Sequence, residues 1–225
     1  MRVALTMHCD QTTGRLDDAL RAAGAKSWRF HLERGDRLPE PDSFDRVVVL
    51  GGAMGAYDGA RFPWLDLEKK WLRELVAGRV PILGICLGSQ LLADALGGEA
   101  FRADLPEAAV IALELTEAGQ ADPVVSHAGP LVYSLHQDTF SLPPGATLLA
   151  RTELFPHAFR CGSALALQFH PDADLDQALR WGREDWGVLG AAGVSYDHYA
   201  AQLAAADALL DAGSRALFAS WLEEE

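Results

Sequence analysis

Hydrophobic and polar positions in the first fifty residues follow the pattern of strands joined by a helix and a loop. Residues 46–50 form a continuous apolar, β-branched run, which is typical of a parallel strand buried on both faces. Ahead of it the pattern predicts strands over residues 2–7 and 27–31, with a helix between them over about residues 13–23. A polar, proline-bearing loop is expected over residues 33–44.

The next segment repeats this order of strand and helix. Pro63 and Trp64 open a predicted amphipathic helix that runs to about Val76. Residues 80–93 are then predicted to form a buried strand, a sharp turn and a second helix, which closes at Gly97. This alternation predicts an α/β fold with a parallel sheet.

From residue 99 the pattern changes to short strand-like runs, at residues 110–115, 147–150 and 164–169. Antiparallel strands added at the edge of the sheet would account for these runs. After Asp174 the chain is alanine-rich and predicted to be helical to the end, with breaks at residues 190–193 and near Gly213.

Length and composition fit one globular domain. The 225 residues are 49% hydrophobic and 23% charged, and they contain no internal repeat or low-complexity linker. We therefore expect a single domain over residues 1–225, with a helical C-terminal extension from about residue 175. No apolar run approaches the roughly 18 residues of a membrane-spanning helix, and no signal peptide is recognisable, so we expect a cytoplasmic location and no membrane partner.

Charge and motif content exclude several other classes. A net charge of −13 and a pI near 4.9 argue against nucleic acid as a partner. The three cysteines are widely spaced and odd in number, which argues against a disulfide framework. Without C-x-x-C or H-E-x-x-H, no metal site is expected. Gly51 and Gly52 lack the third glycine of a dinucleotide fingerprint, and no cofactor is expected.

Cys86 occupies the sharp turn between the predicted strand and helix. Gly84 and Gly88 flank it symmetrically, and such glycines let the chain pass closely around a nucleophile held at a strained backbone angle. The N-terminus of the following helix favours a thiolate over a thiol. This arrangement indicates covalent acyl chemistry at Cys86; the alternative is a small buried residue that merely ends an apolar strand.

His170 is the candidate base for that nucleophile. It ends an apolar run and precedes Pro171, so it can project from the C-terminal edge of the sheet, where α/β active sites lie. Asp172 could accept a hydrogen bond from the imidazole and hold its tautomer. Taken without Cys86, His170 would more often be a structural or surface histidine, and the pairing with the predicted elbow reverses that balance.

These segments together resemble the class I, triad-type glutamine amidotransferases, and most closely stand-alone members similar to the glutaminase domain of GMP synthase. The resemblance covers about residues 2–172. It rests on four motifs in the family's order: Gly51-Gly52-Ala53-Met54, Leu83-Gly84-Ile85-Cys86-Leu87-Gly88-Ser89-Gln90, His136-Gln137-Asp138 and Gln168-Phe169-His170-Pro171-Asp172.

The resemblance implies a three-layer α/β/α, flavodoxin-like fold and hydrolysis of L-glutamine to glutamate and ammonia. Cys86 would form a γ-glutamyl thioester, and His170 would move the protons. Backbone N–H groups of Gly52 and Leu87 would form the oxyanion hole. The resemblance also assigns Gln90, His136 and Asp138 to substrate binding. Because 225 residues leave no room for a synthetase domain, a separate synthetase or acceptor subunit is the expected partner.

Three features depart from the family pattern. Asp172 stands where glutamate is usual, and its shorter side chain reaches His170 only if the backbone lies closer or a water intervenes. Residues 101–109 lack a glycine-tryptophan stretch that many relatives carry, and the C-terminal Trp181, Trp186 and Tyr196 match no motif and are interpreted as packing residues. Two alternatives therefore stay open: a hydrolase of another γ-glutamyl amide, and a degenerate amidotransferase acting as a binding or regulatory subunit.

Overall fold

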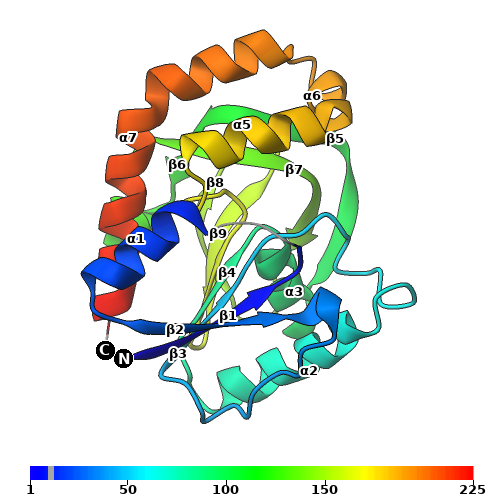
Figure 1. Ribbon diagram of the computed structural model, residues 1–225, viewed down its shortest axis with the longest axis vertical. Helices are drawn as coiled ribbons and strands as arrows, with labels where there is room; N and C mark the ends of the chain where they lie inside the picture. The colour runs from blue at the N-terminus through cyan, green and yellow to red at the C-terminus, as the bar shows by residue number, and fades with distance from the viewer. Residues whose placement is uncertain (10–12, 225) are drawn as a thin grey trace.

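A mixed β-sheet forms the centre of the molecule. The computed structural model describes residues 1–9 and 13–224, and within them the sheet has eight strands in the order β2-β1-β3-β4-β10-β9-β8-β6 (Figure 1). The first five are parallel: β2 (Lys26–His31), β1 (Arg2–Met7), β3 (Arg46–Val49), β4 (Ile82–Ile85) and β10 (Ala164–Leu167). The others extend one edge in antiparallel pairing: β9 (Pro156–Cys161), β8 (Thr147–Arg151) and β6 (Glu114–Leu115).

Helices cover both faces of this sheet. On one face, α1 (Gly14–Ala22) and the end of α7 (Tyr196–Glu223) share a core with alternate strand residues such as Leu5, Ile85 and Leu167. On the other, α2 (Trp64–Ala77) and α3 (Leu87–Ala95) pack on the intervening ones, such as Val47 and Ala166. The expected three-layer α/β/α arrangement with a mostly parallel sheet is confirmed.

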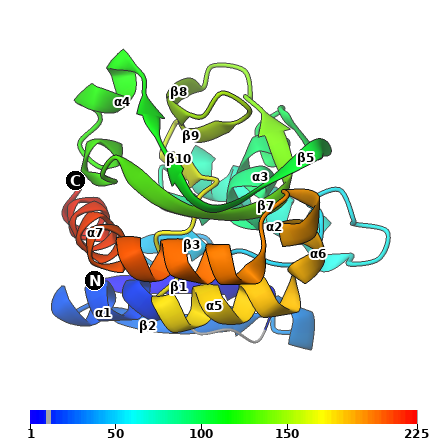
Figure 2. The ribbon, with the colours of Figure 1, turned by 90° about the horizontal axis from the view of Figure 1, so that it is seen from above.

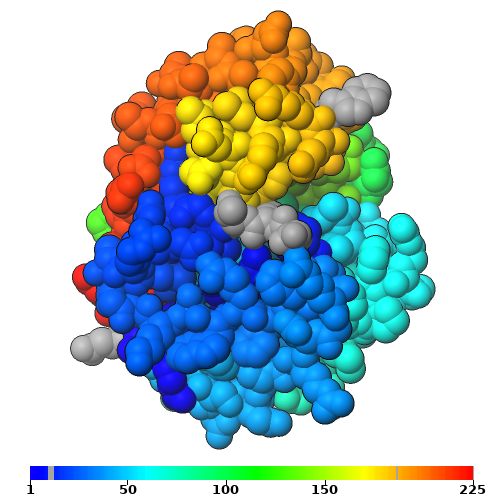
Figure 3. Space-filling model, viewed as in Figure 1, coloured from blue at the N-terminus to red at the C-terminus, as the bar shows by residue number. Residues whose placement is uncertain are grey.

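A second, two-stranded sheet pairs β5 (Glu99–Ala112) with β7 (Leu131–Ser141). It packs against α5 (Leu175–Glu184), α6 (Trp186–Ala191) and α7 through apolar side chains, and Figure 2 shows α5 and α7 lying beside one another below it. In the space-filling view, α5 and α7 form one continuous surface at this end of the molecule (Figure 3). The remaining short elements are η1 (Leu32–Arg34), α4 (Glu117–Ala121) and η2 (Val125–His127).

The prediction of one edge strand over residues 110–115 is wrong. Residues up to Ala112 belong to β5 and pair with β7, with Val110 opposite Tyr133, whereas Glu114 and Leu115 pair with β8 in the main sheet. The run therefore passes from one sheet to the other. Strand propensity alone cannot show which partner each half selects.

The predicted break near Gly213 is also wrong, whereas the break at residues 190–193 is confirmed. The helix α7 continues through Gly213, because this glycine serves close packing: a Cβ there would lie 2.4 Å from the carbonyl oxygen of Ala128. By contrast, Gly193 has φ +71° and lies between α6 and α7. None of the helices in the described residues is both long and apolar enough to cross a membrane.

We expect Gly213→Ala to lower the free energy of unfolding by about 1–3 kcal/mol, because the added methyl group meets backbone at Ala128 and not a flexible side chain. The matched control is Gly190→Ala in α6, where no described atom outside the backbone of that helix lies within 4 Å of the added Cβ. That change should be neutral or stabilising by up to about 1 kcal/mol. Urea unfolding measures both, and equal effects of the two substitutions would contradict this account of Gly213.

Candidate functional site

Cys86 lies at the elbow between β4 and α3 with φ 52° and ψ −109°, a left-handed conformation that a residue with a Cβ rarely adopts. Its N–H donates to the carbonyl oxygen of Leu167 at the end of β10, 2.8 Å away. The predicted strained turn is confirmed, and Cys86 is 7% exposed.

The flanking glycines are required by how closely the chain passes itself at this elbow. A Cβ on Gly88 would lie 2.1 Å from the carbonyl oxygen of Val49, and one on Gly84 would lie 2.6 Å from that of Gly88. Neither position can hold a larger residue without moving α3 away from the sheet. The glycines thus allow α3 to begin directly beneath the sulfur.

His170 follows β10, the neighbour of β4, so the two parallel strands deliver Cys86 and His170 to the same edge of the sheet. The backbone N–H of His170 donates to the carbonyl oxygen of Tyr133. The Nδ1 atom of its ring lies 3.1 Å from Oδ1 of the fully buried Asp172. The shorter aspartate therefore makes the contact directly. The backbone of Asp172 is itself held by the N–H of Arg15, 2.9 Å from its carbonyl oxygen.

Cys86 and His170 line one cavity and are electrically coupled. The pKa of His170 is raised to about 10: burial would lower it, but the negative charges of Cys86 and Asp172 more than offset burial. An imidazolium at neutral pH is what stabilises a neighbouring thiolate.

Cys9 lines the same cavity but has a different environment. Burial, together with the charges of Glu33 and Asp172, raises the pKa of the Cys9 thiol to about 12. Cys9 therefore remains protonated at neutral pH, where a thiol is a poor nucleophile. Of the two cavity cysteines, Cys86 is the one in position for chemistry.

The glycine loop after β3 passes beside both reactive side chains. A Cβ on Gly51 would lie 3.0 Å from Cε1 of His170 and 3.5 Å from Cβ of Cys86. A Cβ on Gly52 would lie 2.7 Å from a methyl group of Leu87, so the two residues expected to supply the oxyanion hole are neighbours. The structure thus brings Gly52 and Leu87 together next to Cys86.

A buried ion pair holds the start of this loop. His8 lies just after β1, and its Nδ1–H donates to the carbonyl oxygens of Leu50 and Gly51, at 2.9 and 3.2 Å. Its Nε2 lies 2.8 Å from Oε2 of Glu68 on α2, and neither side chain is exposed. Burial would lower the pKa of His8, but Glu68 more than offsets burial and raises it. No local sequence motif indicates this pair, because His8 and Glu68 are 60 residues apart in the chain.

The predicted substrate-binding residues also meet beside Cys86. Gln90 and Asp138 line the second cavity that includes Cys86, and the Gln90 amide donates to the Asp138 carbonyl oxygen at 3.0 Å. His136 Nδ1 lies 2.9 Å from the same oxygen. The Asp138 carboxylate accepts from the hydroxyl of Tyr57 at 2.9 Å, and burial raises its pKa.

Several residues that line the cavity were not predicted from the sequence. Arg61, Arg102 and Asp185 bring charges of both signs into the cavity with Asp138. Arg102 lies in the segment that departs from the family pattern, directly opposite Asp138 in the pairing of β5 with β7. Only this strand pairing reveals its place, because 36 residues separate the two along the chain.

The C-terminal helices form one wall of the site. This role was not predicted, because these helices contain no recognisable motif. Trp181 of α5 packs 4.8 Å from the ring of His170 and lines the cavity with Glu184. Its interpretation as a packing residue is therefore incomplete. Tyr196 packs on Tyr199, and the side chain of Trp186 lies outside the part that the structure describes.

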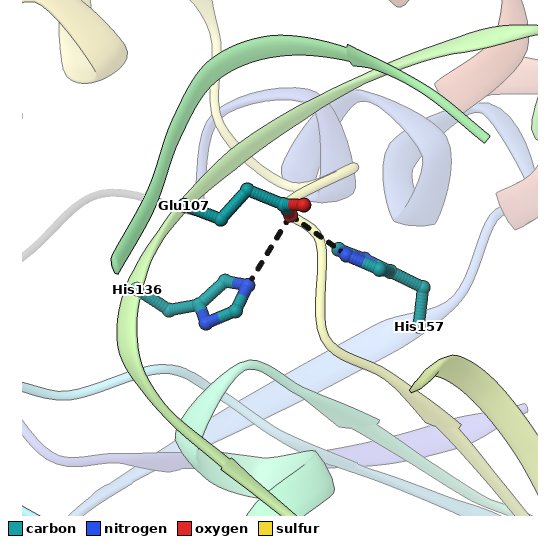
Figure 4. A group of neighbouring side chains, drawn as sticks. All are labelled: Glu107, His136 and His157. Atoms are coloured by element: carbon teal, nitrogen blue, oxygen red, sulfur yellow. Dashed lines mark ion pairs between the residues drawn. The ribbon is translucent and has the colours of Figure 1, made fainter. Parts of the chain in front are cut away.

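A second cluster of titratable groups lies behind the cavity: Glu107, His136 and His157 could together offer three ligand atoms to a metal ion (Figure 4). No metal site was expected, because the sequence contains neither C-x-x-C nor H-E-x-x-H. Such local motifs do not report a cluster of this kind. The three residues come from β5, β7 and β9, and only the fold brings them together.

The fold and the site define a flavodoxin-like α/β protein with a cysteine, a histidine and a carboxylate at the C-terminal edge of its parallel sheet. The family of class-I glutamine amidotransferases matches residues 8–179, which is most of the chain, and the chain belongs to this family.

Among curated proteins, the chain is 37% identical over 136 residues to a glutamine amidotransferase-like protein, YfeJ, of Salmonella typhimurium, covering 58% of this chain and 56% of that one. It is 34% identical over 164 residues to the glutamine-hydrolysing GMP synthase of Aeropyrum pernix, covering 70% of this chain but 29% of the synthase. The chain thus spans about half of the first relative and under a third of the second.

Solved structures match over nearly the whole chain. A glutamine amidotransferase of Thermotoga maritima superimposes with a TM-score of 0.87 at 27% identity, covering 100% of this chain and 99% of that one. A second, from Methylobacillus flagellatus, gives 0.86 at 25% identity and covers 98% and 93%. The C-terminal helices are therefore part of an arrangement that these proteins share.

We expect the imidazole of His170 to titrate near pH 10 and to titrate at a lower pH in Cys86→Ala, because the substitution removes a negative charge and leaves the burial. Histidine-labelled NMR across a pH series measures both values. Cys161→Ala is the matched control, since Cys161 ends β9 and lines neither cavity described above. An unchanged titration in Cys86→Ala would contradict the coupling.

Proposed function

We propose that this chain hydrolyses L-glutamine to glutamate and ammonia through a thioester on Cys86. The observation that carries the proposal is the strained elbow that presents Cys86 to a His170 of raised pKa in one cavity. Family membership supports the same chemistry.

In the first half-reaction the Cys86 thiolate attacks the carboxamide carbon, and the carbonyl π electrons move to oxygen. The N–H groups of Gly52 and Leu87 stabilise this oxyanion, since Gly52 lines the cavity with Cys86 and Leu87 directly follows Cys86. His170, as imidazolium, donates its proton to the amide nitrogen. The C–N bond then breaks, ammonia leaves, and a γ-glutamyl thioester remains on Cys86.

In the second half-reaction the neutral His170 removes a proton from water as the water oxygen attacks the thioester carbon. The C–S bond breaks, glutamate is released, and the thiolate–imidazolium pair is restored. Asp172 holds the Nδ1–H of His170, so that Nε2 stays directed at the reacting groups. Asp172 is therefore a positioning residue in this mechanism.

The amino-acid end of glutamine would occupy the cavity between Cys86 and Asp138. Asp138 offers a carboxylate and a fixed carbonyl oxygen, which suit an α-ammonium group. Gln90 and His136 hold that carbonyl in place. The arginines Arg61 and Arg102 in the same cavity suit an α-carboxylate.

We further propose that ammonia passes to an acceptor bound by a separate synthetase subunit. The GMP synthase relative supports this, because the chain matches 29% of its length and that protein is described as glutamine-hydrolysing. The two alternatives, another γ-glutamyl amide as substrate and a binding subunit without turnover, are outcomes of the experiment below.

Glutamate release from L-glutamine should fall by about 10³-fold or more in Cys86→Ala and in His170→Ala, since each removes a reacting group. Asp172→Asn should cost less, about 10- to 100-fold, because a thiolate forms without full help from the orienting acid. An enzyme-coupled glutamate assay on the purified chain gives all three values. Cys161→Ala is the control and should retain full turnover.

A panel of γ-glutamyl amides and peptides and a chloroketone analogue of glutamine separate the remaining cases. Turnover of another γ-glutamyl compound in preference to glutamine would replace the substrate but keep the mechanism. Labelling of Cys86 without turnover would indicate that a partner is needed. Absence of both labelling and turnover in the wild type would sink the enzymatic proposal and leave a binding subunit.

A further inference from the structure

Three buried side chains from three strands converge beside the substrate cavity, and two of them, Glu107 and His157, have no part in the proposed reaction. Nε2 of His157 lies 2.7 Å, and Nε2 of His136 lies 3.4 Å, from Oε2 of Glu107 (Figure 4). The three residues are 8% exposed or less. Glu107 and His136 are directly paired residues of β5 and β7, while His157 belongs to β9 of the main sheet.

The hydrogen bond of His136 determines which of its nitrogens carries the proton. A carbonyl oxygen can only accept, so the contact with the Asp138 carbonyl requires a hydrogen on Nδ1. Nε2 is therefore the ring nitrogen of His136 that remains to bind an ion, and it faces Glu107.

The facing oxygen of Glu107 is also electron-rich. Its Oε2 lies within 3.4 Å of one ring nitrogen of each histidine, and a carboxylate oxygen binds hydrogen-bond donors or cations. Nε2 of His136 and Nδ1 of His157 make no hydrogen bond to any described residue, and Nε2 of His157 has only the close contact with Glu107. Buried polar atoms that lack hydrogen-bond partners in this way are costly unless something else, such as a bound ion, satisfies them.

We propose that Glu107, His136 and His157 bind a divalent transition-metal ion of the zinc type. Two imidazole nitrogens and one carboxylate oxygen form a donor set that suits such an ion. Bonds of about 2.0–2.1 Å in tetrahedral geometry put ligand atoms about 3.3 Å apart. The His136–Glu107 separation of 3.4 Å already fits, and the His157–Glu107 separation needs to open by about 0.6 Å, from 2.7 Å to about 3.3 Å.

Neighbouring groups hold these proposed ligands in place through hydrogen bonds to their remaining polar atoms. Ser134 and Thr152 donate to the two oxygens of Glu107 at 3.1 and 2.9 Å. His136 donates its other ring N–H to a backbone carbonyl, one of the usual outer partners of a metal-bound histidine. Both arrangements hold the ligands before an ion arrives.

An ion here would join the two sheets and hold part of the substrate cavity. It would tie β5 and β7 to β9 of the main sheet, at a point where β5 has an irregular register between Arg102 and Glu107. Through His136 it would also hold the Asp138 carbonyl that Gln90 contacts. The site is structural, and it stands whether or not Cys86 turns over glutamine.

The test uses the full chain with Cys86→Ala, because a thiolate beside His170 could bind zinc by itself. After removal of metal with a chelator and dialysis against Zn²⁺, this protein should retain about one zinc per chain, and Zn²⁺ should raise its Tm by about 5 °C or more. Adding His157→Gln should reduce retained zinc to below about 0.1 per chain and abolish the shift.

Adding His31→Gln in place of His157→Gln is the matched control. His31 also lies beside a glutamate, Glu33, with 3.1 Å between ring nitrogen and carboxylate, but both side chains are partly exposed and belong to a different part of the fold. The protein with Cys86→Ala and His31→Gln should retain as much zinc as the protein with Cys86→Ala alone. Equal retention in the His157→Gln and His31→Gln proteins, or no retention in the parent, would overturn the proposal and leave a hydrogen-bonded cluster.

X-ray absorption at the zinc edge of the parent protein needs no ligand variant and decides the case if His157→Gln fails to fold. Two imidazole ligands with oxygen, and no sulfur, are expected. A sulfur ligand, or an ion bound by oxygen alone, would place the zinc elsewhere and overturn the assignment.

Discussion

The site depends on how closely α3 approaches the sheet at Cys86. The backbone there is left-handed, and Gly88 leaves no room for a side chain between the helix and Val49. This approach places a helix N-terminus directly under the sulfur, where its partial positive charge favours the thiolate. The strain at Cys86 persists because β4 and β10 fix the chain before it and α3 fixes the chain after it.

Buried polar contacts then hold the loops around that point. His8 and Glu68 fix the glycine loop from α2, and the amide of Gln90 fixes the Asp138 carbonyl from α3. Because these groups are shielded from water, each contact is stronger than it would be on the surface, and an unpaired member would be costly. The cavity is thus shaped by polar pairs from distant segments as much as by apolar packing.

Local pattern was sufficient for most elements that carry the site. The apolar run at residues 46–50 and the glycines around Cys86 each predict their own local geometry, and the structure has these elements where they were expected. The strand before His170 was expected at an antiparallel edge, but β10 lies inside the sheet and is parallel to β4. Gly213 misled because a glycine that permits close packing looks the same in sequence as one that ends a helix. Residues 110–115 misled because strand propensity does not identify a partner strand.

The sequence by itself determined the main strands and helices up to Gly97, the strained elbow at Cys86 and the family, because these depend on residues near one another in the chain. It did not predict β7 or β9. Tertiary structure alone decided what faces these residues. It placed Trp181 against His170, Arg102 opposite Asp138, and Glu107 between two histidines. Such contacts join segments tens of residues apart, and only the pairing of strands and the packing of helices across them set those distances.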